Sequence, residues 1–205
     1  IISKLLDIKI KNMLSLKDSL VVLKKTNALL EGHFVLSSGL HSPKYVQCAK
    51  LLSYPHLSKN FCKSLSQKVK KKIKKIDLII SPAMGGIIIG YELGRILKKE
   101  TIFCERVKGK FKLRRGFFIK KNSRVLIVED VITTGKSSLE CASLIKKSKA
   151  KIIGFACLID RTNKKTLKIK KHQLISQIKI DVPTFPKNKL PSFLKKIPIT
   201  KPGSR

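Results

Sequence analysis

The spacing of apolar residues in the first part of the chain predicts two helices separated by a β-rich segment. Over residues 14–30 the apolar side chains recur at near-helical spacing, which is typical of an amphipathic helix. Over residues 33–48 short apolar stretches flank Ser-Ser-Gly and Ser-Pro, which indicates two short strands with turns. Pro55 then begins a second helix that extends to about Lys72 and carries lysines on its exposed face.

The middle of the chain alternates between short apolar strands and helices. The expected strands cover residues 77–81, 101–104, 124–129 and 151–160, and the expected helices cover residues 85–97 and 136–147. Strands that alternate with helices are typical of a parallel sheet covered on both faces. The last 45 residues are rich in Lys and Pro and contain one amphipathic stretch, residues 189–198. We therefore predict an α/β fold in a single domain of 205 residues.

The cysteines and the apolar runs limit where the protein works. Five cysteines are scattered along the chain, with no Cys-x-x-Cys pair and no Cys/His cluster at metal-ligand spacing. They are typical of buried thiols in a reducing cytosol. No apolar run approaches the roughly 20 residues that a membrane helix needs. We expect a cytoplasmic protein with no membrane partner.

The formal net charge of +34 is the most extreme feature of the composition. Taken alone, it would suggest binding to nucleic acid or to an anionic surface. However, 39 lysines stand against 7 arginines and tryptophan is absent, whereas base-reading surfaces favour Arg and stacking platforms need aromatic residues. We prefer an AT-rich genome as the source of the lysines, and we expect no specific nucleic-acid partner. A nucleic-acid-binding regulator remains the alternative.

The strongest chemical signal is the segment 125-VLIVEDVITTGKSS-138. A buried strand ends in two adjacent carboxylates, Glu129 and Asp130, at the edge where open α/β sheets bind ligands. Such carboxylates can accept hydrogen bonds from a sugar diol or orient a hydrated Mg²⁺. The loop that follows has the features of a phosphate cradle, because Gly135 permits a tight turn and the next helix directs its positive end at an anion. A diol site beside a phosphate cradle describes a site for ribose 5-phosphate.

Other interpretations of this segment are weaker. A buried strand followed by a capped helix would need only one Ser or Thr, and here two carboxylates precede four hydroxyl residues. The loop lacks the GxxxxGK[ST] pattern of a P-loop, and it also lacks the GxGxxG pattern of a dinucleotide site.

The segment resembles the phosphoribosyl pyrophosphate (PRPP) signature of type I phosphoribosyltransferases. In order along nearly the whole chain, further segments resemble the orotate phosphoribosyltransferases among them: residues 34–45, 81–86, 103–117, 157–161 and 201–205. The resemblance implies the type I phosphoribosyltransferase fold, a twisted parallel sheet flanked by helices with a small hood. Here the hood would comprise about residues 14–52 and the C-terminal tail, beside a core at about residues 55–162.

The resemblance also implies how the substrates bind. Glu129 and Asp130 would bind the ribose hydroxyls, and the loop after them would bind the 5-phosphate. The implied PRPP-binding residues are Glu129, Asp130, Val131, Ile132, Thr133, Thr134, Gly135, Lys136 and Ser137. Thr133 and Arg161 would contact orotate, since a guanidinium can pair with a carboxylate in bidentate geometry. The alternative for Arg161 is a surface salt bridge with Asp160 or Glu140.

The expected catalytic cations lie after the strand at residues 101–104. Arg106 resembles the pyrophosphate-binding base of the family. Many members also carry a lysine before Ser-Gly, an aromatic-lysine pair after Pro-Ala, and a loop rich in Lys and His; this chain has Ser37, Met84-Gly85 and the loop VKGKFKLRRG. The usual catalytic lysine therefore cannot be assigned. The candidates to replace it are Lys108, Lys110, Lys112, Arg114 and Arg115, in a Gly-bearing loop of the kind that closes over a site. The alternative is that several of these residues are merely solvated.

The resemblance implies a reaction, a cofactor and an oligomer. PRPP and orotate would give orotidine 5-phosphate and pyrophosphate, a step of pyrimidine synthesis. Mg²⁺ would be held mainly by PRPP and water, with no direct protein ligand. A homodimer is implied, in which a mobile loop reaches the partner's site. The alternatives are a phosphoribosyltransferase for another base and a regulator that kept the fold but lost the activity.

Overall fold

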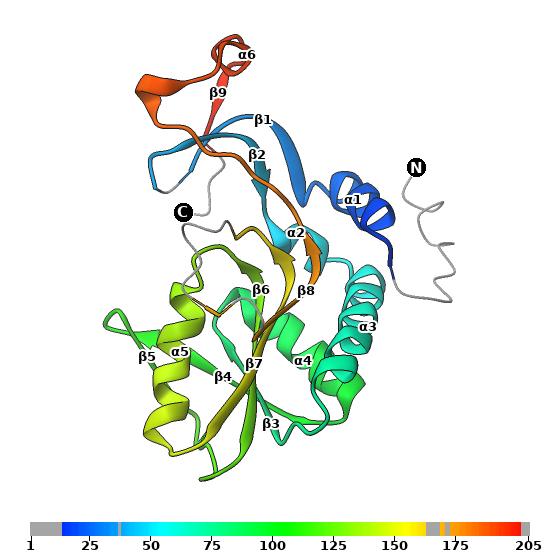
Figure 1. Ribbon diagram of the computed structural model, residues 1–205, viewed down its shortest axis with the longest axis vertical. Coiled ribbons are helices and arrows are strands. Elements are labelled where there is room, and N and C mark those ends of the chain that lie inside the picture. The colour runs from blue at the N-terminus through cyan, green and yellow to red at the C-terminus, as the bar shows by residue number, and fades with distance from the viewer. Residues whose placement is uncertain (1–13, 37, 163–168, 171–172, 202–205) are drawn as a thin grey trace.

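The computed structural model describes residues 14–36, 38–162, 169–170 and 173–201, and a six-stranded sheet forms its centre (Figure 1). The strands are β3 (Leu78–Pro82), β4 (Glu100–Val107), β5 (Lys110–Lys112), β6 (Arg124–Ile132), β7 (Lys151–Asp160) and β8 (Leu174–Lys179). Their order across the sheet is β5-β4-β3-β6-β7-β8. Each neighbouring pair is parallel except β4 and β5. The parallel sheet predicted from the strand and helix alternation is confirmed.

Helices cover both faces of this sheet (Figure 1). On one face lies α5 (Lys136–Lys147), which connects β6 to β7, and on the other lie α3 (Pro55–Lys72) and α4 (Gly85–Leu97). Two apolar clusters fill the space between the sheet and these layers. Each helix contributes fully buried residues to them, for example Leu65 of α3, Leu93 of α4 and Ile145 of α5. Burial on both faces explains why the strands read as continuous apolar runs.

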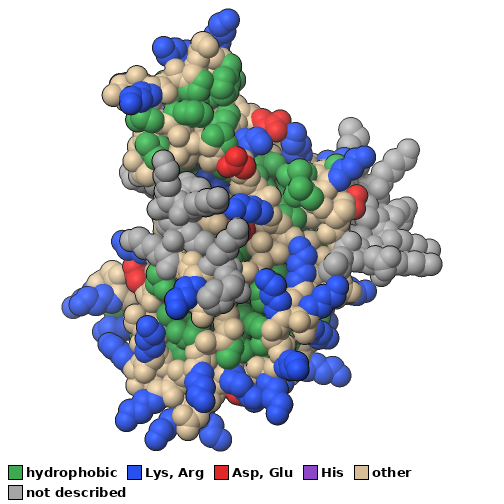
Figure 2. All heavy atoms as spheres, viewed as in Figure 1, with side chains coloured by type: hydrophobic (Ala, Val, Ile, Leu, Met, Phe, Trp, Pro, Cys, Tyr) green, Lys and Arg blue, Asp and Glu red, His purple; other side chains and the backbone are tan. Residues whose placement is uncertain are grey.

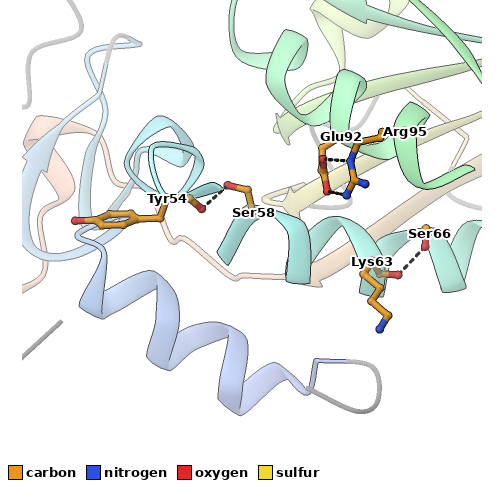
Figure 3. Close-up of polar contacts among 6 residues, drawn as sticks. All are labelled: Tyr54, Ser58, Lys63, Ser66, Glu92 and Arg95. Atoms are coloured by element: carbon orange, nitrogen blue, oxygen red, sulfur yellow. Dashed lines mark hydrogen bonds and ion pairs between the residues drawn. The ribbon is translucent and has the colours of Figure 1, made fainter. Parts of the chain in front are cut away.

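Several polar side chains of the α3 and α4 layer are satisfied within their own helices (Figure 3). The hydroxyls of Ser58 and Ser66 donate to carbonyl groups earlier in the chain at 3.1 and 2.7 Å. Arg95 donates to both carboxylate oxygens of Glu92 at 2.8 and 2.7 Å. These contacts stabilise the helices, so these side chains are not candidates for the chemistry, which we look for at the carboxyl edge of the sheet.

A second, smaller sheet lies beyond the ends where β6 and β7 finish (Figure 1). Its strand order is β2-β1-β9, and the N-terminal hairpin pairs in parallel with the last strand of the tail. The elements of this part are α1 (Leu16–Lys25), β1 (Leu29–Val35), β2 (His41–Val46), α2 (Cys48–Leu52), the 3-10 helix η3 (Lys187–Lys189), α6 (Ser192–Lys195) and β9 (Ile199–Thr200). The C-terminal tail therefore returns to the N-terminal segment.

Some predicted boundaries were wrong. The first helix was expected over residues 14–30, but α1 ends at Lys25 because Asn27 turns the chain with a φ of 55° and Leu29 already belongs to β1. Strand β8 was missed in the Lys-rich tail. Two of the segments that carry the family resemblance, residues 34–45 and 201–205, are only partly described. Ser37 in the first and residues 202–205 in the second lie outside the described residues.

The basic side chains are widely spread on the face shown in Figure 2, from the lower core to the tip of the small sheet. On this face the basic side chains are not gathered into a single stripe of the kind that follows a nucleic-acid backbone. Within the described residues, no helix is long and apolar enough to cross a membrane.

Candidate active site

The adjacent carboxylates Glu129 and Asp130 lie near the end of β6, on the edge of the sheet that faces the small sheet. The Glu129 side chain is buried and its Oε2 accepts a hydrogen bond of 2.6 Å from the Ser138 hydroxyl. Oδ1 of Asp130 accepts from the backbone N–H of Val131 at 2.8 Å. Although the chain has 46 Lys and Arg residues, neither carboxylate forms an ion pair in the described part of the chain. The pair is therefore available to a ligand.

Burial disfavours the ionised form of both carboxyl groups. It raises the pKa of Glu129 to about 7, with a smaller contribution from the neighbouring charge of Asp130 and an opposing one from the Ser138 hydroxyl. Burial raises the pKa of Asp130 as well. Two carboxyl groups held close together, with no cation among the described residues, favour a ligand that donates hydrogen bonds or brings positive charge.

The loop after β6 presents free backbone donors at the start of α5. Gly135 is the N-cap residue, with a φ of 76°, and no side chain caps the helix there. The backbone N–H of Lys136 donates to the Thr134 hydroxyl at 3.3 Å, whereas those of Ser137 and Ser138 have no acceptor among the described residues. Unsatisfied N–H groups at a helix N-terminus attract anions.

Gly135 is required at its position by more than its φ. A Cβ atom there would lie 2.6 Å from Cδ1 of Ile169, which packs beneath the loop. The loop is therefore held close to the protein, with Thr133 and Thr134 exposed above it. This geometry supports the phosphate cradle predicted from the sequence.

Arg161 extends this edge of the sheet toward the hood. Its backbone N–H donates to the Ile132 carbonyl at 2.9 Å, which joins the ends of β7 and β6 and places Arg161 beside the residue that follows Ile132, Thr133. Burial lowers the pKa of its guanidinium, and Tyr45 of β2 opposes that shift. The buried Nε of Arg161 has no partner within the described residues.

The salt bridges considered for Arg161 are absent from the described residues. Glu140 pairs with Arg106 at 2.7 Å, and Asp160 Oδ1 accepts from the backbone N–H of Thr162 at 2.7 Å. A half-buried guanidinium without an anion is costly unless a ligand supplies one.

The expected mobile loop is a β-hairpin in this structure. Strands β4 and β5 pair antiparallel through a turn at Lys108 and Gly109, whose φ values of 49° and 78° suit a two-residue hairpin turn. Lys108, Lys110 and Lys112 are exposed, and no hydrogen bond or ion pair in the described part joins them to residues 129–138. The structure does not bring these lysines to the carboxylates.

Arg106 is held by three groups on the other side of this hairpin. It pairs with Glu140 of α5, donates to the Gly109 carbonyl at 2.8 Å, and stacks over the Phe111 ring at 4.1 Å from its centroid. These contacts fix the base of the hairpin against α5. Its expected role at pyrophosphate stays a prediction.

Comparison with known proteins places this arrangement in a family. Residues 51–188 match the phosphoribosyl transferase domain. An orotate phosphoribosyltransferase of Parvibaculum lavamentivorans is 48% identical over 183 residues, which are 89% of this chain and 93% of that protein. One of Erythrobacter litoralis is 44% identical, over 89% of this chain and 94% of that protein. The chain belongs to the orotate phosphoribosyltransferase family.

A solved structure supports the same fold. The crystal structure of orotate phosphoribosyltransferase from Aeropyrum pernix superposes with a TM-score of 0.63 at 24% identity, over 78% of this chain and 92% of that one. The type I phosphoribosyltransferase fold and the family predicted from the signature are both confirmed.

Two residues that contact the acid pair of this orotate phosphoribosyltransferase were missed from the sequence. A Cβ atom on Gly85 would lie 2.7 Å from Oδ2 of Asp130, so no side chain fits there unless the carboxylate moves. Ser138 was counted among the four hydroxyl residues of the motif, but its contact with Glu129 spans nine positions and gives no local signal.

Proposed function

We propose that the protein transfers ribose 5-phosphate from PRPP to N1 of orotate, which gives orotidine 5-phosphate and pyrophosphate in pyrimidine synthesis. Family membership supports the reaction. The observation that supports this site is the largely buried acid pair, which has no cation partner among the described residues, beside a helix N-terminus whose Ser137 and Ser138 N–H groups have no acceptor there. A sugar diol and a phosphate satisfy these two needs together.

Glu129 and Asp130 bind the ribose hydroxyls, which donate to the carboxylates. The residues from Thr133 to Ser137 bind the 5-phosphate through hydroxyl and backbone N–H groups. Together they fix the anomeric carbon while N1 of orotate attacks it. The N1–carbon bond forms, the carbon–oxygen bond to pyrophosphate breaks, and the leaving pyrophosphate takes the electron pair, while the N1 proton is released. Positioning and charge compensation carry most of the catalysis.

Orotate binds through its carboxylate to Arg161, with Thr133 beside it. The unpartnered Nε of Arg161 and its guanidinium fork match a carboxylate in bidentate geometry. Tyr45 of the hood lies close enough to affect the Arg161 charge, so the base is bound between the hood and the sheet edge.

Mg²⁺ accompanies PRPP in this proposal. The described residues contain no group of three or more His, Cys, Asp or Glu that could hold a metal ion. The ion would be carried by phosphate oxygens and water, and its charge would offset that of the departing pyrophosphate.

The protein forms a homodimer in this proposal, and the α4 surface is a candidate interface. Met84, Ile88 and Tyr91 are 82%, 51% and 67% exposed, and their spacing places them on one face of the helix. Apolar side chains gathered in this way mark interaction surfaces. The hairpin cations Arg106, Lys108, Lys110 and Lys112 are assigned to pyrophosphate in the site of the partner subunit. This assignment takes account of Lys108, Lys110 and Lys112, which no hydrogen bond or ion pair in the described part joins to residues 129–138 of their own subunit.

We expect sedimentation equilibrium to give the mass of two chains for the native protein and of one chain for Tyr91→Asp. A charge in a buried interface costs several kcal/mol, roughly a thousandfold or more in the dimer constant. The matched control is Leu16→Asp, since Leu16 is 55% exposed on α1. A dimer that survives Tyr91→Asp would place the interface elsewhere.

The reaction is tested by supplying Mg²⁺ and PRPP with one base at a time and measuring release of pyrophosphate. We expect rapid release with orotate and release slower by about a hundredfold or more with uracil, which lacks the carboxylate. Adenine and hypoxanthine should give none. Preference for a purine, or no turnover with any base, would overturn the proposed function.

A further inference from the structure

Ser138 makes a contact that neither phosphate binding nor helix capping explains. It lies in the first turn of α5, where a serine side chain commonly bonds to the backbone of its own helix. Instead its hydroxyl, which is 0% exposed, donates to Glu129 Oε2 at 2.6 Å. A buried hydroxyl that donates to a carboxylate makes a short, charge-assisted hydrogen bond.

The two ends of Ser138 face the two halves of the PRPP site. Its backbone N–H is one of the unsatisfied donors at the start of α5, and its side chain contacts the ribose-binding carboxylate. The other carboxylate oxygen of Glu129, Oε1, accepts no hydrogen bond from the described residues. One oxygen is therefore fixed by the protein and the other is left for the sugar.

We propose that Ser138 is a positioning residue that orients Glu129, favours its charged form, and so couples binding of the 5-phosphate to binding of the ribose hydroxyls. The inference rests on the proposed function, because it assigns Glu129 to the ribose. It also rests on the hydrogen bond from Ser138 to Glu129, which can be tested without substrates.

The groups around Glu129 leave Ser138 as its main stabilising partner. Asp130 is its chain neighbour, Cys141 lies on the same helix as Ser138, and Cys157 is its register partner on β7. A hydrogen bond with Cys104, followed by burial, raises the pKa of Cys141, and burial raises that of Cys157, so both thiols are neutral. Asp130 repels the Glu129 charge, and no described cation pairs with it.

The substrate-free test follows the ionisation of Glu129 by carbon-13 NMR in protein labelled at its six glutamates. In the native protein the Glu129 carboxyl should titrate near pH 7, because its pKa is raised to about 7 by burial. In Ser138→Ala the midpoint should rise by roughly one pH unit or more, since a donor to the charged form is lost. The matched control is Ser143→Ala, whose exposed hydroxyl on the same helix bonds only to the Leu139 carbonyl at 3.2 Å. A midpoint that does not move contradicts the proposal.

The kinetic test compares the KM for PRPP of Ser138→Ala and the native protein from pH 6.5 to 9. We expect a ratio of roughly ten near pH 7 that falls toward two at pH 9, where Glu129 ionises in both proteins. Titration of PRPP itself cancels in the ratio. A ratio that stays constant with pH would mean that Ser138 has only a packing role. If the NMR midpoint moves but Glu129→Gln leaves the KM unchanged, the assignment of Glu129 to the ribose has failed instead.

Discussion

The double variant Glu129→Gln, Asp130→Asn is expected to lose PRPP use and yet to be more stable than the native protein at pH 8. Each change removes a charge-assisted acceptor without changing side-chain volume. Such bonds contribute roughly 1.5–3 kcal/mol each, so kcat/KM for PRPP should fall by about a hundredfold or more. The steady-state rate with PRPP as the varied substrate measures this loss.

The gain in stability follows from the raised pKa of Glu129. Its folded value of about 7 lies above the unfolded value of 4.5. The protonated form is therefore favoured by folding, and the stability that it gives is complete below pH 4.5 and lost as the pH rises through 7. At pH 8 the ionised Glu129 costs about 3 kcal/mol, by the shift of 2.5 pH units, and Gln removes that cost.

Urea unfolding at pH 5 and at pH 8 tests this part of the prediction. Glu129→Gln should raise the free energy of unfolding more at pH 8 than at pH 5, and the exposed Glu100→Gln is the control that should change neither. Unchanged kcat/KM in the double variant would refute the role of the pair. Lower stability at pH 8 would show that Glu129 is stabilising as an anion.

Replacing Arg161 by Ala is expected to raise the KM for orotate far more than the KM for PRPP. The guanidinium supplies a bidentate partner to the orotate carboxylate, and its loss should cost on the order of a hundredfold. Arg161→Lys should rescue only part of the affinity, because an ammonium lacks the fork. The enzyme should also lose most of its preference for orotate over uracil.

Steady-state kinetics with each substrate varied separately measure this effect. The matched control is Arg124→Ala, since Arg124 pairs with Asp77 through two hydrogen bonds of 2.8 and 2.6 Å at the start of β6, on the opposite edge of the sheet. It should leave both KM values unchanged. Equal effects of Arg161→Ala on orotate and PRPP, or no effect on either, would make Arg161 a structural residue.

The sequence predicted the elements that have clear ends. Helices α4 and α5 and strand β7 match their expected ranges, since Gly-Gly, Thr-Thr-Gly and charged residues interrupt the apolar pattern there. The first helix was drawn too long because Leu29 and Leu30 continue its apolar pattern while belonging to β1. Strand β8 was missed because Ser176 and Gln177 break its short apolar run.

The candidate site was predicted where its residues are adjacent in sequence. The acid pair, the hydroxyls and Gly135 lie within ten positions, and their chemistry can be inferred from their order. Arg161 forms no ion pair with Glu140 because Glu140 pairs instead with Arg106 of β4. The place of Gly85 against Asp130 likewise depends on how α4 meets β6. Such facts arise from packing and have no local pattern.

The most direct test of the PRPP site is to follow the backbone amide signals of the protein by NMR while PRPP and Mg²⁺ are added. The largest shifts are predicted for Gly135, Lys136, Ser137 and Ser138, because the 5-phosphate binds at the start of α5, where the N–H groups of Ser137 and Ser138 have no acceptor among the described residues. In Glu129→Gln, Asp130→Asn these shifts should require a much higher PRPP concentration. Shifts spread over the lysine-rich surface, with residues 135–138 unchanged, would contradict the account.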